Sequence, residues 1–120
     1  MSLTSSMEDY LKAILVLHQR HGNARCVDVA DYLGVSKPSV SRAVKELTKS
    51  GHIIKKDGTL YLTQQGRQYA EQICERYQFF TARLVDAGVD RKTAEHDACN
   101  IEHAISAEAF QKLKDSLGEK

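Results

Sequence analysis

Residues 26 to 51 read CVDVADYLGVSKPSVSRAVKELTKSG, and this pattern predicts two helices joined by a tight turn. The first helix runs from about Cys26 to Leu33, and Gly34 follows where the turn needs a left-handed residue. The second helix starts at Ser36 or Lys37, with Pro38 in the first turn, where a missing N–H costs nothing. We expect the apolar side chains around the turn to point inward: Val29, Leu33, Val35, Val40 and Ala43.

The neighbouring segments complete a recognisable order of elements. A helix is expected from Thr4 to about Gln19, upstream of the helix pair. Two β-rich runs follow it, 52–56 and 59–62, on either side of Asp57-Gly58, which is a strong hairpin signal. Helix, short helix, glycine turn, helix and hairpin is the order of a winged helix-turn-helix. Such modules usually bind DNA, although some serve only in protein contacts.

The outer face of the second helix of the pair carries basic and hydroxyl side chains that suit DNA. Its N-terminal turn favours phosphate or base contacts, and Arg42, one turn further on, suits bidentate reading of a guanine. Pro38 is placed to touch a thymine methyl, although its role in starting the helix explains it equally well. Wing lysines would hold phosphates, with ordinary surface lysines as the alternative. The predicted DNA-contacting residues are Ser36, Lys37, Pro38, Ser39, Ser41, Arg42, Lys45, Lys55 and Lys56.

The second half of the chain reads as three further helices, so the fold class is mainly α. A long helix capped by Thr63 is expected to keep a 3.6-residue apolar period as far as Ala87-Gly88, with Tyr77 on its apolar stripe. Another helix is expected from Asp90 to about Ala104, and a last one from Ser106 with Phe110, Leu113 and Leu117 inward. We predict a DNA-binding domain over 1–63 and a helical domain over 64–120, in which 64–87 is a connecting helix.

Residues 93 to 103, TAEHDACNIEH, carry metal-binding side chain types at helical spacing. At about 100° per residue the polar members share one arc, while the apolar members fall on a separate stripe. A solvated helix face is the alternative, but such a face usually mixes charge signs for pairing, and a cysteine is uncommon there. Histidine, cysteine and carboxylate at i, i+3 and i+4 favour a metal site. The arc contains Glu95, His96, Cys99, Glu102 and His103, and the stripe contains Ala94, Ala98 and Ile101.

Composition and charge narrow the class of protein. The 120 residues are 42% hydrophobic and 28% charged, with a net charge of +1, which is ordinary for a globular domain. No apolar run approaches the ~18 residues of a membrane span, and the N-terminus does not resemble a signal peptide, so we expect a cytoplasmic protein. Three cysteines predict reduced thiols rather than a disulfide framework. Residues 36–56 are basic and residues 86–120 are acidic, which suggests a polyanion-binding module joined to a region with a different function.

Four segments together resemble the diphtheria toxin repressor and manganese transport regulator family of metal-dependent repressors. They are SMEDYL at 6–11, VADYLGVS at 29–36, LTQQG at 62–66 and CNIEH at 99–103. The resemblance implies a winged helix-turn-helix followed by a helical dimerisation and metal-binding domain. It also implies a homodimer formed through residues from about 85 to 117, and operator DNA binding when Mn(II) or Fe(II) is bound. The residues at ligand positions are Asp9, Cys99, Glu102 and His103.

This chain also departs from the family pattern. Tyr77 stands where the family normally has a histidine, and Lys12 stands where manganese-sensing members have a second acid in the first helix. Cys99 resembles the iron-sensing branch and Asp9 the manganese branch, so the ligand set does not decide the metal. We expect a short form of the family, without the SH3-like domain that iron-sensing members often carry. Tyr77, His96 and Glu95 remain as weaker ligand candidates.

The sequence leaves two alternatives to metal-dependent regulation. One is a metal-independent winged-helix regulator that uses Cys99 as a redox switch or takes another small ligand. The other is a metalloenzyme. The sequence offers no deep-pocket scaffold, no glycine-rich phosphate loop and no base beyond the ligands, so it favours a non-enzymatic protein.

Overall fold

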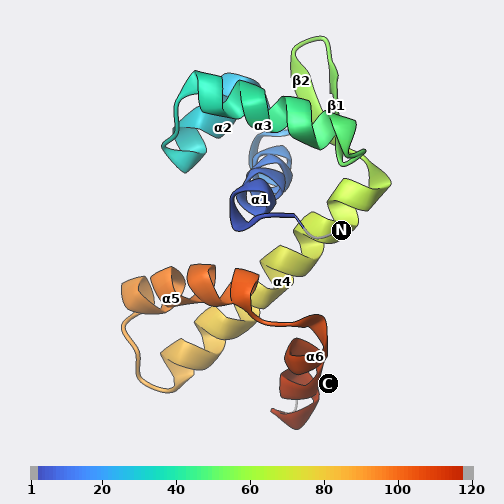
Figure 1. Ribbon diagram of the computed structural model, residues 1–120. Coiled ribbons are helices and arrows are strands. Elements are labelled where there is room, and N and C mark those ends of the chain that lie inside the picture. Colours follow the sequence, from blue (N-terminus) through green and yellow to red (C-terminus); the bar gives the residue numbers. More distant parts are fainter. Residues whose placement is uncertain (1–2, 118–120) are drawn as a thin grey trace. The chain divides into compact units, whose positions relative to one another are not determined.

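The computed structural model describes residues 3–117, which fold into helices and one β-hairpin (Figure 1). Their contacts form two compact units that divide between Gln72 and Ile73, so that the longest helix contributes to both. The elements are α1 (Ser5–His21), α2 (Cys26–Leu33), α3 (Lys37–Lys49), β1 (Ile53–Lys56), β2 (Thr59–Leu62), α4 (Gln64–Asp86), α5 (Arg91–Ala104) and α6 (Ala107–Ser116). The mainly α fold class is confirmed, and the domain boundary at residue 64 stays a prediction.

Side-chain caps fix where most helices begin. Thr4 caps α1 by accepting from the Met7 N–H at 3.2 Å, and Ser36 caps α3 by accepting from the Ser39 N–H at 3.2 Å. Ser106 caps α6 in the same way, accepting from the Ala109 N–H at 3.1 Å. Each cap satisfies an N–H that has no partner inside the helix. These positions lie within one or two residues of the predicted starts.

In the first unit, α1 is the central element and contacts α2, α3 and β2. Its residues Leu11, Ile14 and Leu15 are almost fully buried, with 0%, 1% and 2% exposure. Val29 of α2 and Val40 of α3 are also fully buried. Val35 was expected to point inward but is 37% exposed. Its N–H bonds back to the Ala30 carbonyl at 3.1 Å, so Val35 lies in the turn, outside the buried faces of both helices.

The hairpin is the wing, and it is attached to the end of α1. Its strands pair antiparallel from Ile53↔Leu62 to Lys56↔Thr59. Asp57 and Gly58 both have positive φ, 52° and 79°, as a type I′ turn requires. The Leu60 N–H donates to the Ala24 carbonyl at 2.7 Å, and the Leu60 carbonyl lies 2.6 Å from His18 Nε2. The wing therefore has a defined position on α1.

Gly66, in the first turn of α4, allows the helix to start directly beside the wing. A Cβ at this residue would lie 1.9 Å from the His52 carbonyl oxygen, which accepts a hydrogen bond from the Thr63 N–H at 3.0 Å. Thr63 caps this helix by accepting from the Gly66 N–H at 3.1 Å. Only glycine permits this close approach of two backbone segments.

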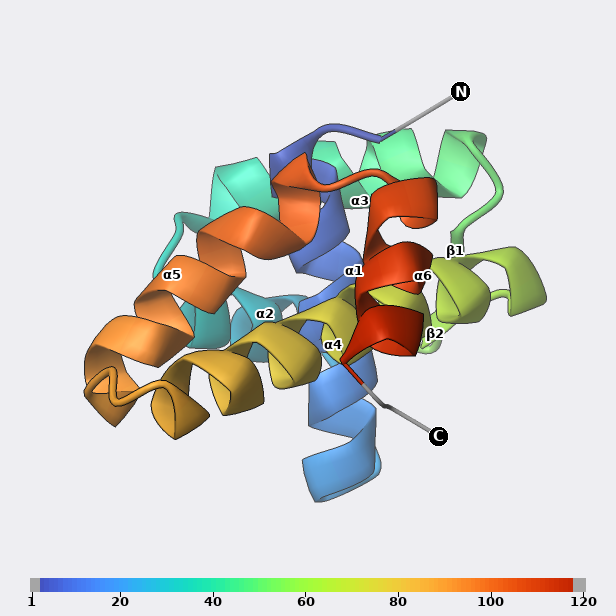
Figure 2. The ribbon, with the colours of Figure 1, turned by 90° about the horizontal axis from the view of Figure 1, so that it is seen from below.

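The second unit contains the C-terminal half of α4 with α5 and α6, and α5 runs back alongside that half in both ribbon views (Figure 2). Phe79, Phe80 and Phe110 form an aromatic cluster, with ring centroids 5.2 to 6.0 Å apart. Phe110 is 6% exposed, but Leu113 and Leu117, which were expected inward, are 38% and 50% exposed. In this short helix Phe110 packs in the cluster, and the Lys114 ammonium lies 5.4 Å from the Phe110 ring centroid. No helix among residues 3–117 is long and apolar enough to cross a membrane.

Candidate metal centre and nucleic-acid interface

The last two turns of α5 carry three potential metal ligands at i, i+3 and i+4. Glu102 is fully buried, and its Oε2 lies 3.2 Å from His103 Nε2, whose side chain is 10% exposed. Cys99 is half-buried one turn earlier. Glu102 continues the buried line of Ala94 and Ala98 at four-residue steps, so the expected separation of polar arc and apolar stripe is wrong at this residue. A carboxylate is expensive to bury, so this position requires a charged or hydrogen-bonding partner.

Arg76 of α4 holds the end of α5 in place. Its Nη1 donates to the backbone carbonyls of Ile105 at 2.9 Å and Glu102 at 3.3 Å, and its guanidinium lies 5.7 Å from the Phe110 ring centroid. A cation at a helix C-terminus is favourable because it meets carbonyls that have no partner inside the helix. The backbone that carries Glu102 and His103 is thus fixed by a residue that sequence reasoning did not single out. An arginine on an amphipathic helix gives no signal of such a role.

The weaker ligand candidates have different surroundings. The Glu95 carboxylate accepts from Arg91 Nε at 3.2 Å, which is the mixed-sign pairing of a solvated face. His96 is exposed, and Tyr77 is half-buried on α4. Asp9 is half-buried on α1, in the first unit. The structure therefore brings Glu102 and His103 together and leaves His96 and Glu95 on the outer part of the same helix.

The donor set on α5 fits a divalent first-row transition ion. A buried carboxylate, an imidazole and a thiol lie within two helical turns. Mg²⁺ and Ca²⁺ prefer oxygen ligands, whereas imidazole and thiolate suit Mn²⁺, Fe²⁺, Co²⁺ or Zn²⁺ progressively better as the ion becomes softer. The residues of this helix are thus compatible with a bound metal of that class.

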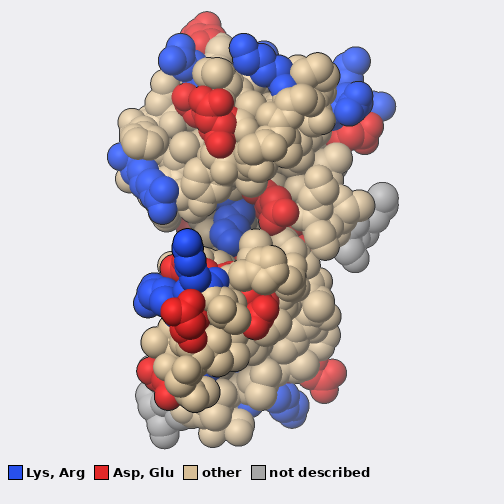
Figure 3. Space-filling view, turned by 90° about the vertical axis from the view of Figure 1, so that its left-hand side faces the viewer, with Lys and Arg blue, Asp and Glu red and all other residues tan. Residues whose placement is uncertain are grey.

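The second candidate site is the outer face of α3 together with the wing. The predicted DNA-contacting residues are exposed there, except Ser39, which is half-buried and whose Oγ lies 2.9 Å from Ser36 Oγ. Lys55 and Lys56 are exposed at the end of β1. Figure 3 shows another side of the molecule, the left-hand side of Figure 1, on which basic and acidic side chains are interspersed.

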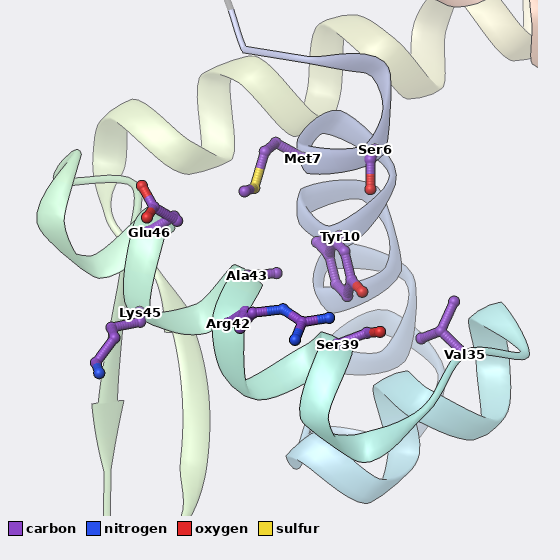
Figure 4. A pocket seen from close by; sticks show the side chains of 9 residues that line it. All are labelled: Ser6, Met7, Tyr10, Val35, Ser39, Arg42, Ala43, Lys45 and Glu46. Atoms are coloured by element: carbon purple, nitrogen blue, oxygen red, sulfur yellow. The ribbon is translucent and has the colours of Figure 1, made fainter.

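A hollow of about 500 Å³ lies between the start of α1 and α3 (Figure 4). Its α1 side was not anticipated, because Ser6, Met7 and Tyr10 meet α3 only through tertiary packing. Tyr10 is 6% exposed, and in Figure 4 its hydroxyl, the Arg42 guanidinium and the Ser39 hydroxyl point toward one another. The lining residues are Ser6, Met7, Tyr10, Val35, Ser39, Arg42, Ala43, Lys45 and Glu46.

Comparison with known families covers nearly the whole chain. Residues 2–58 match the model described as iron dependent repressor, N-terminal DNA binding domain. Residues 63–120 match the iron dependent repressor metal binding and dimerisation domain. The HTH-type transcriptional regulator MntR of Listeria monocytogenes is 36% identical over 113 residues, which are 93% of this chain and 80% of that protein.

Solved structures give the same result. The manganese regulator SloR has a TM-score of 0.84 at 25% identity, with 100% of this chain and 56% of that chain covered. The T. acidophilum IdeR structure has a TM-score of 0.76 at 27% identity, with 98% of this chain and 55% of that chain covered. This chain thus spans about half the length of those two proteins. The resemblance inferred from the sequence is confirmed, and the chain belongs to the iron-dependent repressor family of metal-dependent, DNA-binding transcriptional regulators, which are not enzymes.

Proposed function

We propose that this chain acts as a homodimeric repressor that binds operator DNA when Mn(II) or Fe(II) occupies a site built on α5. The observation that carries the proposal is the fully buried Glu102 carboxylate, 3.2 Å from the His103 imidazole. The manganese-dependent regulators among the similar proteins support a divalent metal of this kind.

The proposed ligands are Asp9, Cys99, Glu102 and His103. The three α5 residues are chosen for their chemistry and spacing, and Asp9 is included because of the family resemblance. A thiolate favours Fe(II), while carboxylates accept Mn(II), so both metals remain in the proposal. A metal that joins Asp9 to α5 would restrain α1, and α1 packs on both helices of the DNA-reading pair. Metal binding would in this way favour one position of α3, the helix that carries most of the proposed DNA contacts.

DNA would be contacted by α3 and the wing. The proposed residues are those predicted from the sequence: Ser36, Lys37, Pro38, Ser39, Ser41, Arg42, Lys45, Lys55 and Lys56. Their hydroxyl, ammonium and guanidinium groups suit phosphates and base edges. A two-fold dimer would present two α3 helices to half-sites about one DNA turn, ~34 Å, apart. The exposed Leu113 and Leu117 of the second unit support dimerisation through that unit.

The test is metal binding and metal-dependent DNA binding, measured on the same variants. Apo protein is titrated anaerobically with Mn(II) and with Fe(II). Binding to duplexes selected from a random pool is then followed by fluorescence anisotropy, with and without chelator. We expect His103→Ala and Glu102→Gln to lose the metal and the metal-stimulated binding.

His96→Ala is the matched control, because His96 is an exposed histidine on the same helix. We expect it to behave like the parent protein. If His103→Ala keeps full metal stoichiometry and metal-dependent DNA affinity, the proposed centre is wrong.

A further inference from the structure

We propose that the hollow between α1 and α3 seats a phosphodiester of the DNA backbone, held by the Arg42 guanidinium and the Tyr10 hydroxyl. The inference rests on the proposed DNA binding and refines it, because it replaces the expected base-reading role of Arg42 with a phosphate contact. It also adds the start of α1 to the DNA-contacting surface.

Tyr10 presents a polar group to the hollow from an otherwise buried side chain. The residue is 6% exposed and lines the hollow, and its side chain forms no hydrogen bond with another residue in the described part of the chain. A tyrosine that only filled the core would be as well served by phenylalanine, since burying an unpaired hydroxyl is unfavourable. The hydroxyl is therefore positioned to donate to something that enters the hollow.

Arg42 contributes the charge. Its guanidinium turns toward Tyr10 and Ser39 (Figure 4), and it makes no ion pair or side-chain hydrogen bond within residues 3–117. Glu46, one turn further along α3, lines the same hollow but does not pair with Arg42. The N–H donors of the guanidinium thus remain available for an acceptor.

A phosphodiester fits these surroundings better than a base edge does. Phosphate oxygens only accept hydrogen bonds, and they match a guanidinium and a phenol that can both donate. An arginine that reads a guanine must extend away from the helix into the major groove, whereas this side chain lies back toward α1. Met7, Val35 and Ala43 give the hollow an apolar wall that suits a deoxyribose.

The experiment measures DNA affinity as a function of salt for the full-length, metal-loaded protein. Two probes are used: a duplex of random sequence and the selected duplex. We expect Arg42→Ala to weaken both roughly tenfold, as for a lost charged hydrogen bond. It should also flatten the slope of log K against log salt by about 0.9, the value for one phosphate contact. Tyr10→Phe keeps the ring and the charge, so it should weaken both duplexes severalfold with the slope unchanged.

Lys92→Ala is the matched control, because it removes one exposed positive charge from α5. It should bind as the parent does. A second measurement replaces single phosphates of the selected duplex by uncharged methylphosphonates. Replacing one particular phosphate in each half-site should lower the DNA affinity of the parent but leave that of Arg42→Ala unchanged. Such non-additivity is expected when the arginine and the phosphate contact each other directly.

Two results would contradict phosphodiester binding in the hollow between α1 and α3 without contradicting the proposed function. One is an Arg42→Ala variant that loses preference at a single base pair but binds the random duplex with the parent's slope. The other is a Tyr10→Phe variant that binds like the parent. If the parent itself binds no duplex with or without metal, the proposed function fails and the inference fails with it.

Discussion

At the scale of single residues, Thr81 of α4 holds a polar atom that the fold does not satisfy. The residue is 4% exposed, and its Oγ1 has no hydrogen-bond partner within the described part of the chain. A buried hydroxyl without a partner carries a desolvation penalty of about 1–3 kcal/mol. Valine has nearly the same shape and no such group.

We expect Thr81→Val to raise the free energy of unfolding by about 1 kcal/mol, because the unpaired hydroxyl is removed and the packing is kept. Urea denaturation followed by circular dichroism measures the change. Thr81→Ser keeps the hydroxyl and loses the methyl group, so it should destabilise the protein. A Thr81→Val variant less stable than the parent would show that the hydroxyl has a partner in solution.

His52 gives the first unit a dependence on pH. It is 5% exposed, its Nδ1 lies 2.7 Å from Ser50 Oγ, and its ring meets Tyr69 edge to face. Desolvation by burial lowers the pKa of His52 below its usual value of 6.5. The unfolded chain therefore binds a proton at higher pH than the folded one, and folding is favoured while His52 is neutral.

The contribution of His52 is fully present above about pH 6.5 and is lost as the pH falls below it. We expect the parent to lose more unfolding free energy than His52→Gln between pH 7.5 and 5. Denaturant titrations across that range give the comparison, since the other titrating groups are common to both proteins. Parallel stability curves would mean that the pKa of His52 is the same in the folded and unfolded chain.

At the scale of elements, helix ends were the most predictable features. Gly34, Pro38, Thr63 and Asp57-Gly58 act through local backbone chemistry, so the observed boundaries follow from the sequence to within a residue or two. Which side chains each helix buries was less predictable. Leu113 and Leu117 have the right spacing for an inward face, but α6 faces α4 with Phe110 and Lys114, whose ammonium pairs with Glu75, and both leucines stay exposed. Burial depends on partners that the local pattern does not contain.

The candidate metal residues likewise combine features that the local sequence predicts with features that depend on tertiary packing. The spacing of Cys99, Glu102 and His103 was visible in the sequence. The burial of Glu102 and the hydrogen bonds from Arg76 were not, since both depend on contacts between residues that are distant in the sequence. The element that sets the ligand geometry is therefore the end of α5 together with the arginine that holds it.

Arg76→Leu tests this role of Arg76 as a positioning residue. Leucine keeps the apolar contact near Phe110 but removes the donors to the carbonyls of Glu102 and Ile105. We expect metal affinity, measured by anaerobic calorimetry, to fall roughly tenfold, the low end for groups that orient ligands. Arg83→Leu is the control, because Arg83 lies on the same helix. Its guanidinium lies over the Phe79 ring at 5.7 Å and forms an ion pair with Asp86 at 2.9 Å. Equal affinities for the two variants would contradict the assignment.

At the scale of the whole molecule, the second unit leaves apolar surface exposed. Leu113 of α6 and Leu117, directly after its end, are 38% and 50% exposed, and Phe110 is buried in the first turn of the helix. A unit of this size cannot bury every apolar side chain by itself. A second copy of the chain would cover the same residues symmetrically, because a two-fold interface uses one patch twice. The family model for this half, a metal binding and dimerisation domain, agrees with that reading.

We expect the double variant Leu113→Asp, Leu117→Asp to shift the protein from dimer to monomer. Each protomer would place two carboxylates in an apolar interface, and buried charges without partners are costly enough to raise the dissociation constant by at least about 100-fold. Sedimentation velocity at micromolar protein, with and without metal, measures the change. Val27→Asp is the control, because Val27 is 40% exposed in the first unit and should leave the dimer intact. The loss of the dimer should also lower the affinity for operator DNA, since a monomer presents one α3 helix instead of two. A double variant that sediments as the parent does would place the interface elsewhere on the chain.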